Sequence, residues 1–123
     1  MTEKKDSLLV NRIKSVGWAF KGAVLLLKTE VSIQIQFVIA ILVTVAGFYY
    51  DISRTEWVFQ ILCIGLVMSI EAINTAVEYI ADFIHPEYHK KIGLIKDIAA
   101  GAVFIASIIA VIIAIIIYYP KVF

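Results

Sequence analysis

The sequence contains very little cysteine, proline and charge. A single cysteine, Cys63, excludes a disulfide within the chain and a zinc site built from several cysteines. Charged residues make up 17% of the 123 residues and apolar residues 62%, whereas soluble domains have about 25% and about 45–50%. A net charge of +1 provides no basic field for a polyanion, so nucleic acid is not expected as a partner. The composition does not favour an ordinary soluble domain, and we expect one domain over residues 1–123.

Long uncharged runs are the main feature that the sequence does contain. Val31–Tyr50 has 20 residues without a charge, Ile98–Tyr119 has 22, and Trp57–Ile70 has 14 before the apolar pattern resumes around a few acids. A helix of about 20 residues rises about 30 Å, the thickness of the hydrocarbon core, and lipid offers no partner to open backbone. The sequence therefore predicts an all-α integral membrane protein with three transmembrane helices, at about 31–50, 57–84 and 92–119.

An amphipathic segment precedes the first span. Residues 8–28 mix apolar side chains with Lys14, Lys21 and Lys28, which recur every seven residues and so share one helical face. This pattern predicts an N-terminal helix that lies on the membrane surface. A cleaved signal peptide is not favoured, because lysines interrupt the apolar run and no small-residue cleavage site follows. Of the two prolines, Pro86 predicts the end of the second span and Pro120 is expected to lie past the third.

Positive charges are distributed unequally between the two sides of the predicted membrane. The N-terminal segment and the 85–97 loop carry nine basic residues, whereas the first loop and the C-terminus carry only Arg54 and Lys121. This asymmetry predicts a cytoplasmic N-terminus. The opposite interface then has an aromatic belt, which agrees with the charge count. The nine basic residues are Lys4, Lys5, Arg12, Lys14, Lys21, Lys28, Lys90, Lys91 and Lys96, and the belt is Tyr49, Tyr50, Trp57, Tyr118 and Tyr119.

The second span carries a polar face. Glu71, Asn74, Glu78 and Asp82 fall within an arc of roughly 80° at about 100° per residue. A carboxylate at membrane depth costs a few kcal/mol, and intramembrane ionisable residues are functional by default. Protonation of these acids, or simple pairing with lysine at the interface, is the structural alternative, and it is most reasonable for Asp82.

More polar residues are expected at the same depth. Glu30 and Gln34 open the first span, and Lys96 and Asp97 open the third. Acids, an amide and a lysine at the inner interface describe a site for a divalent cation holding a polyphosphate, since Mg²⁺ prefers carboxylate oxygens and phosphates. The GxxxxG match at residues 17–22 is followed by Ala-Val rather than Lys-Ser/Thr, so it is not a P-loop.

These motifs resemble those of the prokaryotic diacylglycerol kinase family, which includes undecaprenol kinases. The resemblance rests on an E-x-x-N-x-x-x-E block at 71–78, Asp82, Glu-Tyr-His at 87–89 and the Lys-Asp pair at 96–97. Residues 14–22 and Glu30 also fit, and the similarity covers about residues 11–111.

The resemblance implies a lipid kinase of the bacterial inner membrane that uses ATP and Mg²⁺. It implies a homotrimer with active sites shared between subunits, acting on undecaprenol or diacylglycerol. By position, Glu71 resembles the general base and Glu30 and Glu78 the metal ligands. The nucleotide-binding residues implied by position are Trp18, Asn74, Glu78, Glu87, Tyr88, His89, Lys96 and Asp97, with Asp82 and Gln34 in support.

The sequence departs from the family pattern at four positions. Gln34 stands where many members have a basic residue, Gln36 where an acid or histidine is usual, and Leu94 and Asn11 where arginine is expected. These departures concern nucleotide contacts and lipid preference. Two other functions remain open from the residues alone: a small proton-coupled transporter, which also places a glutamate in the membrane, and a non-catalytic membrane scaffold.

Overall fold

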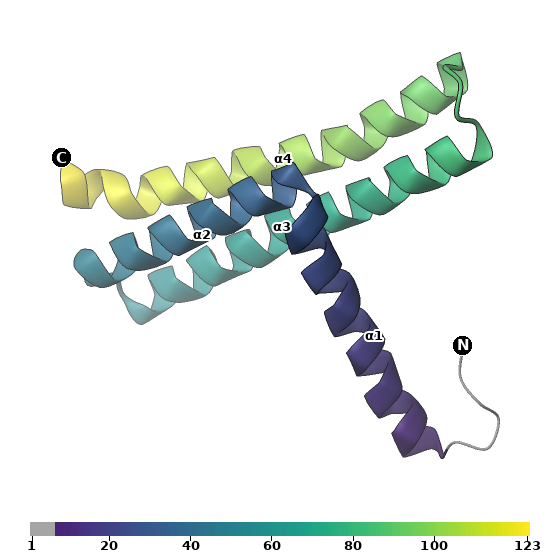
Figure 1. The fold of residues 1–123 in the computed structure, drawn as a ribbon. Helices are drawn as coiled ribbons and strands as arrows, with labels where there is room; N and C mark the ends of the chain where they lie inside the picture. Colours follow the sequence, from purple (N-terminus) through teal and green to yellow (C-terminus); the bar gives the residue numbers. More distant parts are fainter. Residues whose placement is uncertain (1–6) are drawn as a thin grey trace.

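The protein consists of four helices in the computed structural model, which describes residues 7–123 (Figure 1). They are α1 (Leu8–Thr29), α2 (Val31–Tyr49), α3 (Arg54–Ile84) and α4 (Lys90–Val122), and the described chain has no strand. The last three are long and apolar enough to cross a membrane. The prediction of an all-α membrane protein is therefore confirmed. The N-terminal Lys4 and Lys5 lie outside the described residues.

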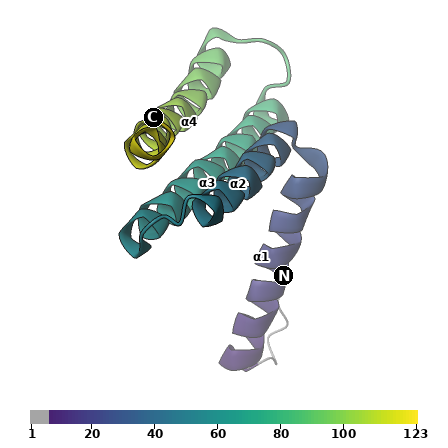
Figure 2. The ribbon, with the colours of Figure 1, turned by 90° about the vertical axis from the view of Figure 1, so that its left-hand side faces the viewer.

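The three helices that can cross a membrane, α2, α3 and α4, run side by side, and α1 leaves this bundle at a steep angle where α2 begins (Figures 1 and 2). The most extensive packing is between α3 and α4, followed by α2 against α3, while α1 packs mainly against α2. The 19 residues of α2 span about 28 Å. The 31 and 33 residues of α3 and α4 span about 46 and 50 Å. Since the hydrocarbon core is about 30 Å thick, the ends of α3 and α4 extend beyond it.

Helix α3 begins three residues earlier than the sequence pattern predicted. The Ser53 hydroxyl accepts a bond from the Glu56 backbone N–H at 3.2 Å, and the Glu56 carboxylate accepts one from the Ser53 N–H at 2.8 Å. This reciprocal capping box satisfies two otherwise unpaired donors and fixes the first turn. A hydrophobicity count misses it, because the capping residues are themselves polar.

The sequence predicted that the third span ends before Pro120. Helix α4 instead continues through Pro120 to Val122. Proline removes one backbone donor, and so close to the end of α4 this loss weakens only the last turn. That turn is held by the Phe123 N–H, which donates to the Tyr119 carbonyl at 3.0 Å, and by Lys121, which pairs with Glu56 of α3 at 3.1 Å. An ion pair between helices thus offsets the missing hydrogen bond.

The turn between α2 and α3 is a Schellman motif. The Ile52 N–H donates to the Gly47 carbonyl at 3.1 Å and the Asp51 N–H donates to the Phe48 carbonyl at 3.3 Å. Asp51 takes a φ of 51°, a left-handed conformation that aspartate tolerates better than most residues. Gly47 is buried beneath the ring of Trp57, so the turn presses α2 directly against the start of α3.

A polar clamp joins the three membrane helices near this turn. The buried Gln60 donates to the Val43 carbonyl at 3.0 Å and accepts a bond from the Tyr118 hydroxyl, which also lies 3.2 Å from the Val43 oxygen. Few apolar side chains are buried, and many large ones are exposed, as expected for helices that face lipid. The apolar residues buried within the described chain include Ile33, Ile52, Ala81, Ala106 and Ile117.

The close approach at Gly47 leads to a stability prediction. A Cβ there would lie 2.6 Å from Trp57 Cη2 and 3.1 Å from Ile52 Cδ1, so Gly47→Ala must displace the indole. We expect it to destabilise the purified protein by about 1–3 kcal/mol, the usual cost of overpacking. Thermal unfolding in detergent measures this. Gly65→Ala is the matched control, because nothing lies within 4 Å of its Cβ position and alanine favours the helix. Equal unfolding temperatures for the two variants would contradict the prediction.

Candidate functional site

A hydrogen-bonded chain of carboxylates and amides connects α2 with α3. Asn74 Nδ2 lies 3.1 Å from Glu71 Oε2 and 3.2 Å from Glu78 Oε1, so one amide donates to both acids. From α2, Gln36 Nε2 donates to the other oxygen of Glu71 at 3.1 Å. Spacings of three and four residues place the α3 members on one face. The polar face predicted for the second span is thus one connected network.

The network runs from the inside of the bundle to its surface. Glu71 is 8% exposed and Asn74 9%, whereas Glu78 is exposed. The Thr75 hydroxyl donates to the backbone carbonyl of Glu71 and leaves its carboxylate to the two amides. Hydrogen bonds through Asn74 therefore connect a buried acid in the apolar interior to an acid that is exposed to water.

Two buried oxygen atoms in this network have no hydrogen-bond partner among residues 7–123. They are Asn74 Oδ1 and Gln36 Oε1, the acceptor ends of the same amides that donate to Glu71. Buried acceptors without partners are uncommon and call for an explanation. Carbonyl and carboxylate oxygens are the ligands of hard cations such as Mg²⁺ and the acceptors of hydroxyl groups. The donor set around Glu71 and Glu78 is therefore suited to a hard cation or a hydroxyl.

Glu30 approaches α3 from the junction of α1 and α2. It is the residue between those helices, and its carboxylate accepts a hydrogen bond from the Tyr79 hydroxyl, one residue after Glu78. Gln34 donates to the carbonyls of Leu27 and Lys28 at 3.0 and 3.3 Å, so it secures the end of α1. Glu30 is thus held at the level of the exposed acid.

The length of α2 indicates the depth of these groups. Val31 begins the helix, and its span of about 28 Å matches the hydrocarbon core, so Glu30 and Tyr79 lie near the edge of that core. Glu71 precedes Tyr79 by eight residues and lies about 12 Å deeper. The acids of this site therefore sit on both sides of the membrane boundary.

A lysine–aspartate pair lies beyond that boundary. Lys96 Nζ contacts Asp82 Oδ1 at 2.6 Å, with side chains 36% and 56% exposed. Asp97 is exposed on the same helix. The pair joins α4 to α3 one helical turn past Glu78, which brings a positive charge to the exposed end of the network.

The remaining predicted residues make local contacts in the single chain. Trp18 lies on α1, with Lys21 Nζ 5.6 Å from its ring centre. In the α3–α4 loop, His85 Nδ1 is 2.7 Å from the Glu87 carbonyl and His89 Nδ1 accepts from the Lys91 N–H. Exposed Tyr88 lies beside Gly93. Within residues 7–123, no three acidic, histidine or cysteine side chains come close enough to hold a metal together.

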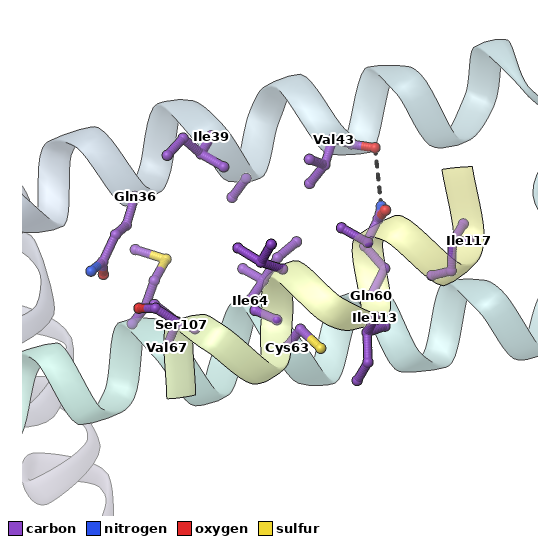
Figure 3. A pocket seen from close by; sticks show the side chains of 15 residues that line it. Gln36, Ile39, Val43, Gln60, Cys63, Ile64, Val67, Ser107, Ile113 and Ile117 are labelled. Carbon is purple, nitrogen blue, oxygen red and sulfur yellow. Dashed lines mark hydrogen bonds between the residues drawn. The ribbon is translucent and has the colours of Figure 1, made fainter. Parts of the chain in front are cut away.

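An apolar cavity lies between α2, α3 and α4. Its volume is about 390 Å³, and Gln36 and Gln60 stand at opposite ends of it (Figure 3). Small side chains from α2 and α4, among them Ala40, Ala110 and Ala114, help to leave it open. Through Gln36, the cavity adjoins the carboxylate of Glu71.

Sequence reasoning missed three polar contacts in this region. Gln36 stands out in the sequence only as a departure from the family pattern, although it contacts Glu71 directly, and nothing singles out Tyr79 as a partner of Glu30. Gln60 lies inside an uncharged run and counts as part of it, yet it is 6% exposed and bonded on both ends. An uncharged polar residue within a membrane span was the available signal in each case.

The chain is similar to known proteins over most of its length. A family model described as "Prokaryotic diacylglycerol kinase" matches residues 17–118. The chain is 36% identical to the undecaprenol kinase of Bacillus subtilis over 122 residues, which cover 98% of this chain and 99% of that protein. It is 35% identical to the diacylglycerol kinase of Escherichia coli K12 over 100 residues, covering 81% and 82% of the two chains. For the diacylglycerol kinase of Haemophilus influenzae, the identity is 29% over 102 residues, covering 83% and 86%.

Proposed function

Since the chain belongs to the prokaryotic diacylglycerol kinase family and is a membrane lipid kinase, we propose that it transfers the γ-phosphate of ATP to a lipid hydroxyl at the network around Glu71. The observation that carries this proposal is the hydrogen-bonded series Gln36–Glu71–Asn74–Glu78. It links a buried acid, Glu71, which a lipid can reach, to an exposed acid, Glu78, which a nucleotide can reach. The whole chain, residues 1–123, acts as one kinase domain.

Glu71 is the proposed general base. Its carboxylate receives two amide hydrogen bonds and keeps further lone pairs free, since a carboxylate has about four acceptor sites. It takes the proton of the lipid hydroxyl as that oxygen forms a bond to the γ-phosphorus and the bond to the bridging oxygen of ADP breaks. The products are a lipid phosphate and ADP, with the proton on Glu71.

Glu30 and Glu78 are the proposed ligands of Mg²⁺. Glu30 is held beside Tyr79 and Glu78 is exposed, and the unpartnered Asn74 Oδ1 adds a further oxygen close to Glu78. This all-oxygen set fits Mg²⁺, which commonly takes one or two carboxylates and fills its other positions with water and phosphate. When bound, the ion offsets the negative charge of the transferring phosphate.

The nucleotide is proposed to lie on the exposed side. Lys96 keeps two N–H bonds beyond the one it gives to Asp82, and these are available to phosphate oxygens. Asp97 and Asn74 organise the phosphates, and the loop residues Glu87, Tyr88 and His89 line the nucleotide pocket together with Trp18. The separation of these groups in a single chain supports a site completed by a second subunit, as in a homotrimer.

The lipid chain is proposed to occupy the apolar cavity beside Gln36. The cavity is lined by residues of the membrane-spanning helices, and its polar end adjoins Glu71. Undecaprenol and diacylglycerol both offer a primary hydroxyl attached to long hydrocarbon. Relatives of this chain are named as kinases of each, so these two lipids are the candidate acceptors.

The site is proposed to face the cytoplasm of a bacterium, in its inner membrane. The distribution of basic residues supports this orientation, since nine of eleven lie on the side of Glu30 and the α3–α4 loop. A transporter is not favoured, because the family model and the relatives of this chain are lipid kinases. A scaffold without activity would not need acceptors left unpaired beside a buried acid.

Replacing the proposed base tests the mechanism. Glu71→Gln keeps the shape of the side chain and removes its basicity, so we expect kcat for lipid phosphorylation to fall about 10²–10⁴-fold, the usual contribution of a general base. The assay uses purified protein, labelled ATP and separate undecaprenol and diacylglycerol acceptors, which also identifies the acceptor. Size-exclusion chromatography of the variant should show an unchanged oligomer. Near-normal turnover would remove Glu71 from this role.

Filling the cavity tests where the lipid lies. Ala110→Leu places three extra carbons in the cavity, so we expect the KM for the lipid acceptor to rise several-fold while the KM for ATP stays within about twofold. Ala102→Leu is the matched control, because Ala102 is exposed on the same helix. If both variants and the unmodified protein have equal KM values for the lipid, the hydrocarbon chain of the lipid does not bind in this cavity.

A further inference from the structure

Gln36 is the one side chain of α2 that hydrogen-bonds to the carboxylate of Glu71 within the described residues. Its Nε2 donates to Glu71 Oε1 at 3.1 Å, while Asn74 Nδ2 donates to Oε2 at 3.1 Å. Two donors on the two oxygens fix both the rotation of the carboxylate and the direction of its remaining lone pairs. Because Gln36 and Asn74 come from different helices, the carboxylate is oriented by the packing of α2 against α3.

The geometry of Gln36 is not what a purely structural amide would show. Gln60, a buried glutamine of the membrane helices, uses both ends of its amide. Its N–H donates to the Val43 carbonyl, and its oxygen accepts from the Tyr118 hydroxyl. In the part of the chain that the structure describes, Gln36 uses only its donor end, and its buried Oε1 has no partner. An unpartnered buried acceptor costs free energy, so stability alone does not account for an amide at this position. Its N–H groups are the part that is used, and they are used on Glu71.

We propose that Gln36 is a positioning residue for phosphoryl transfer: its N–H holds the Glu71 carboxylate facing the end of the apolar cavity, where the lipid hydroxyl arrives. This inference rests on the proposed role of Glu71 as base. Gln36 itself lines that cavity and lies between its apolar space and the carboxylate. It does not take a proton or touch a reacting atom in the proposed step. Its effect is to keep one lone pair of Glu71 aimed at the acceptor.

The experiment compares variants that keep or lose the donor. Gln36→Met and Gln36→Leu remove the N–H, and we expect kcat for lipid phosphorylation to fall about 10–100-fold, as for loss of one hydrogen bond to a charged group. The KM for ATP should stay within about twofold, because Gln36 does not face the nucleotide side. Gln36→His keeps an N–H at similar reach and should recover activity to within about fivefold of the unmodified protein. Thr44→Val is the matched control on α2, since its hydroxyl donates to the Ala40 carbonyl of its own helix, and it should change kcat by less than about twofold.

A double-mutant cycle separates this inference from the proposed function. In the Glu71→Gln background, Gln36→Met should cost little further activity, because the carboxylate it positions is gone. The same fold loss in both backgrounds would overturn the inference, as would full activity of Gln36→Met or equal losses in Gln36→Met and Gln36→His. If both donor-free variants fail to fold while the histidine variant folds, Gln36 has a structural role and the inference also fails. Near-normal activity of Glu71→Gln alone would instead reject the base assignment on which the inference rests.

Discussion

The structure depends on a hydrogen-bonding constraint: a carboxylate about 12 Å inside the membrane boundary must be satisfied by the protein. Glu71 meets this requirement with one amide from its own helix and one from α2. Neutral donors keep the acid partnered without neutralising it, and they determine where its free lone pairs point. Both the packing of α2 on α3 and the chemistry proposed for the site depend on these two amide hydrogen bonds to Glu71.

Contacts at two levels along α2 hold the helix in the register that places Gln36 beside Glu71. In the second half of α2, Gln60 and Tyr118 both bond to the Val43 carbonyl. At the start of α2, Tyr79 bonds to Glu30. A shift of α2 by one turn would move every residue by about 5 Å along the axis and would separate Gln36 from Glu71. The buried Gln60 lies at the far end of the cavity from Gln36. It still affects the site, because its bond to Val43 fixes the axial position of α2 relative to α3.

The sequence predicts the coarse features well, since they depend on composition and helical periodicity. Uncharged runs of about 20 residues identify the spans, and the arc shared by Glu71, Asn74 and Glu78 identifies the polar face. The start of α3 and the end of α4 were predicted wrongly because they depend on a capping box and on a Lys121–Glu56 pair. The contact of Gln36 with Glu71 joins residues 35 positions apart, and helix rotation, which no local pattern specifies, decides it. The roles of the individual site residues, and the subunits that share them, stay predictions.

The division of the site into buried and exposed halves reflects the different partners that each half must exchange. Lys96 and Asp82 are 36% and 56% exposed, and such a pair is screened by water and contributes at most about 1 kcal/mol. A phosphate can therefore compete for that lysine at little cost. The network at Glu71 is buried and cannot exchange partners so freely, because each lost bond leaves a buried polar group unsatisfied. A kinase that joins a soluble nucleotide to a membrane alcohol needs both properties, and in this chain the change from one to the other falls at the level of Glu30 and Tyr79, where α2 begins.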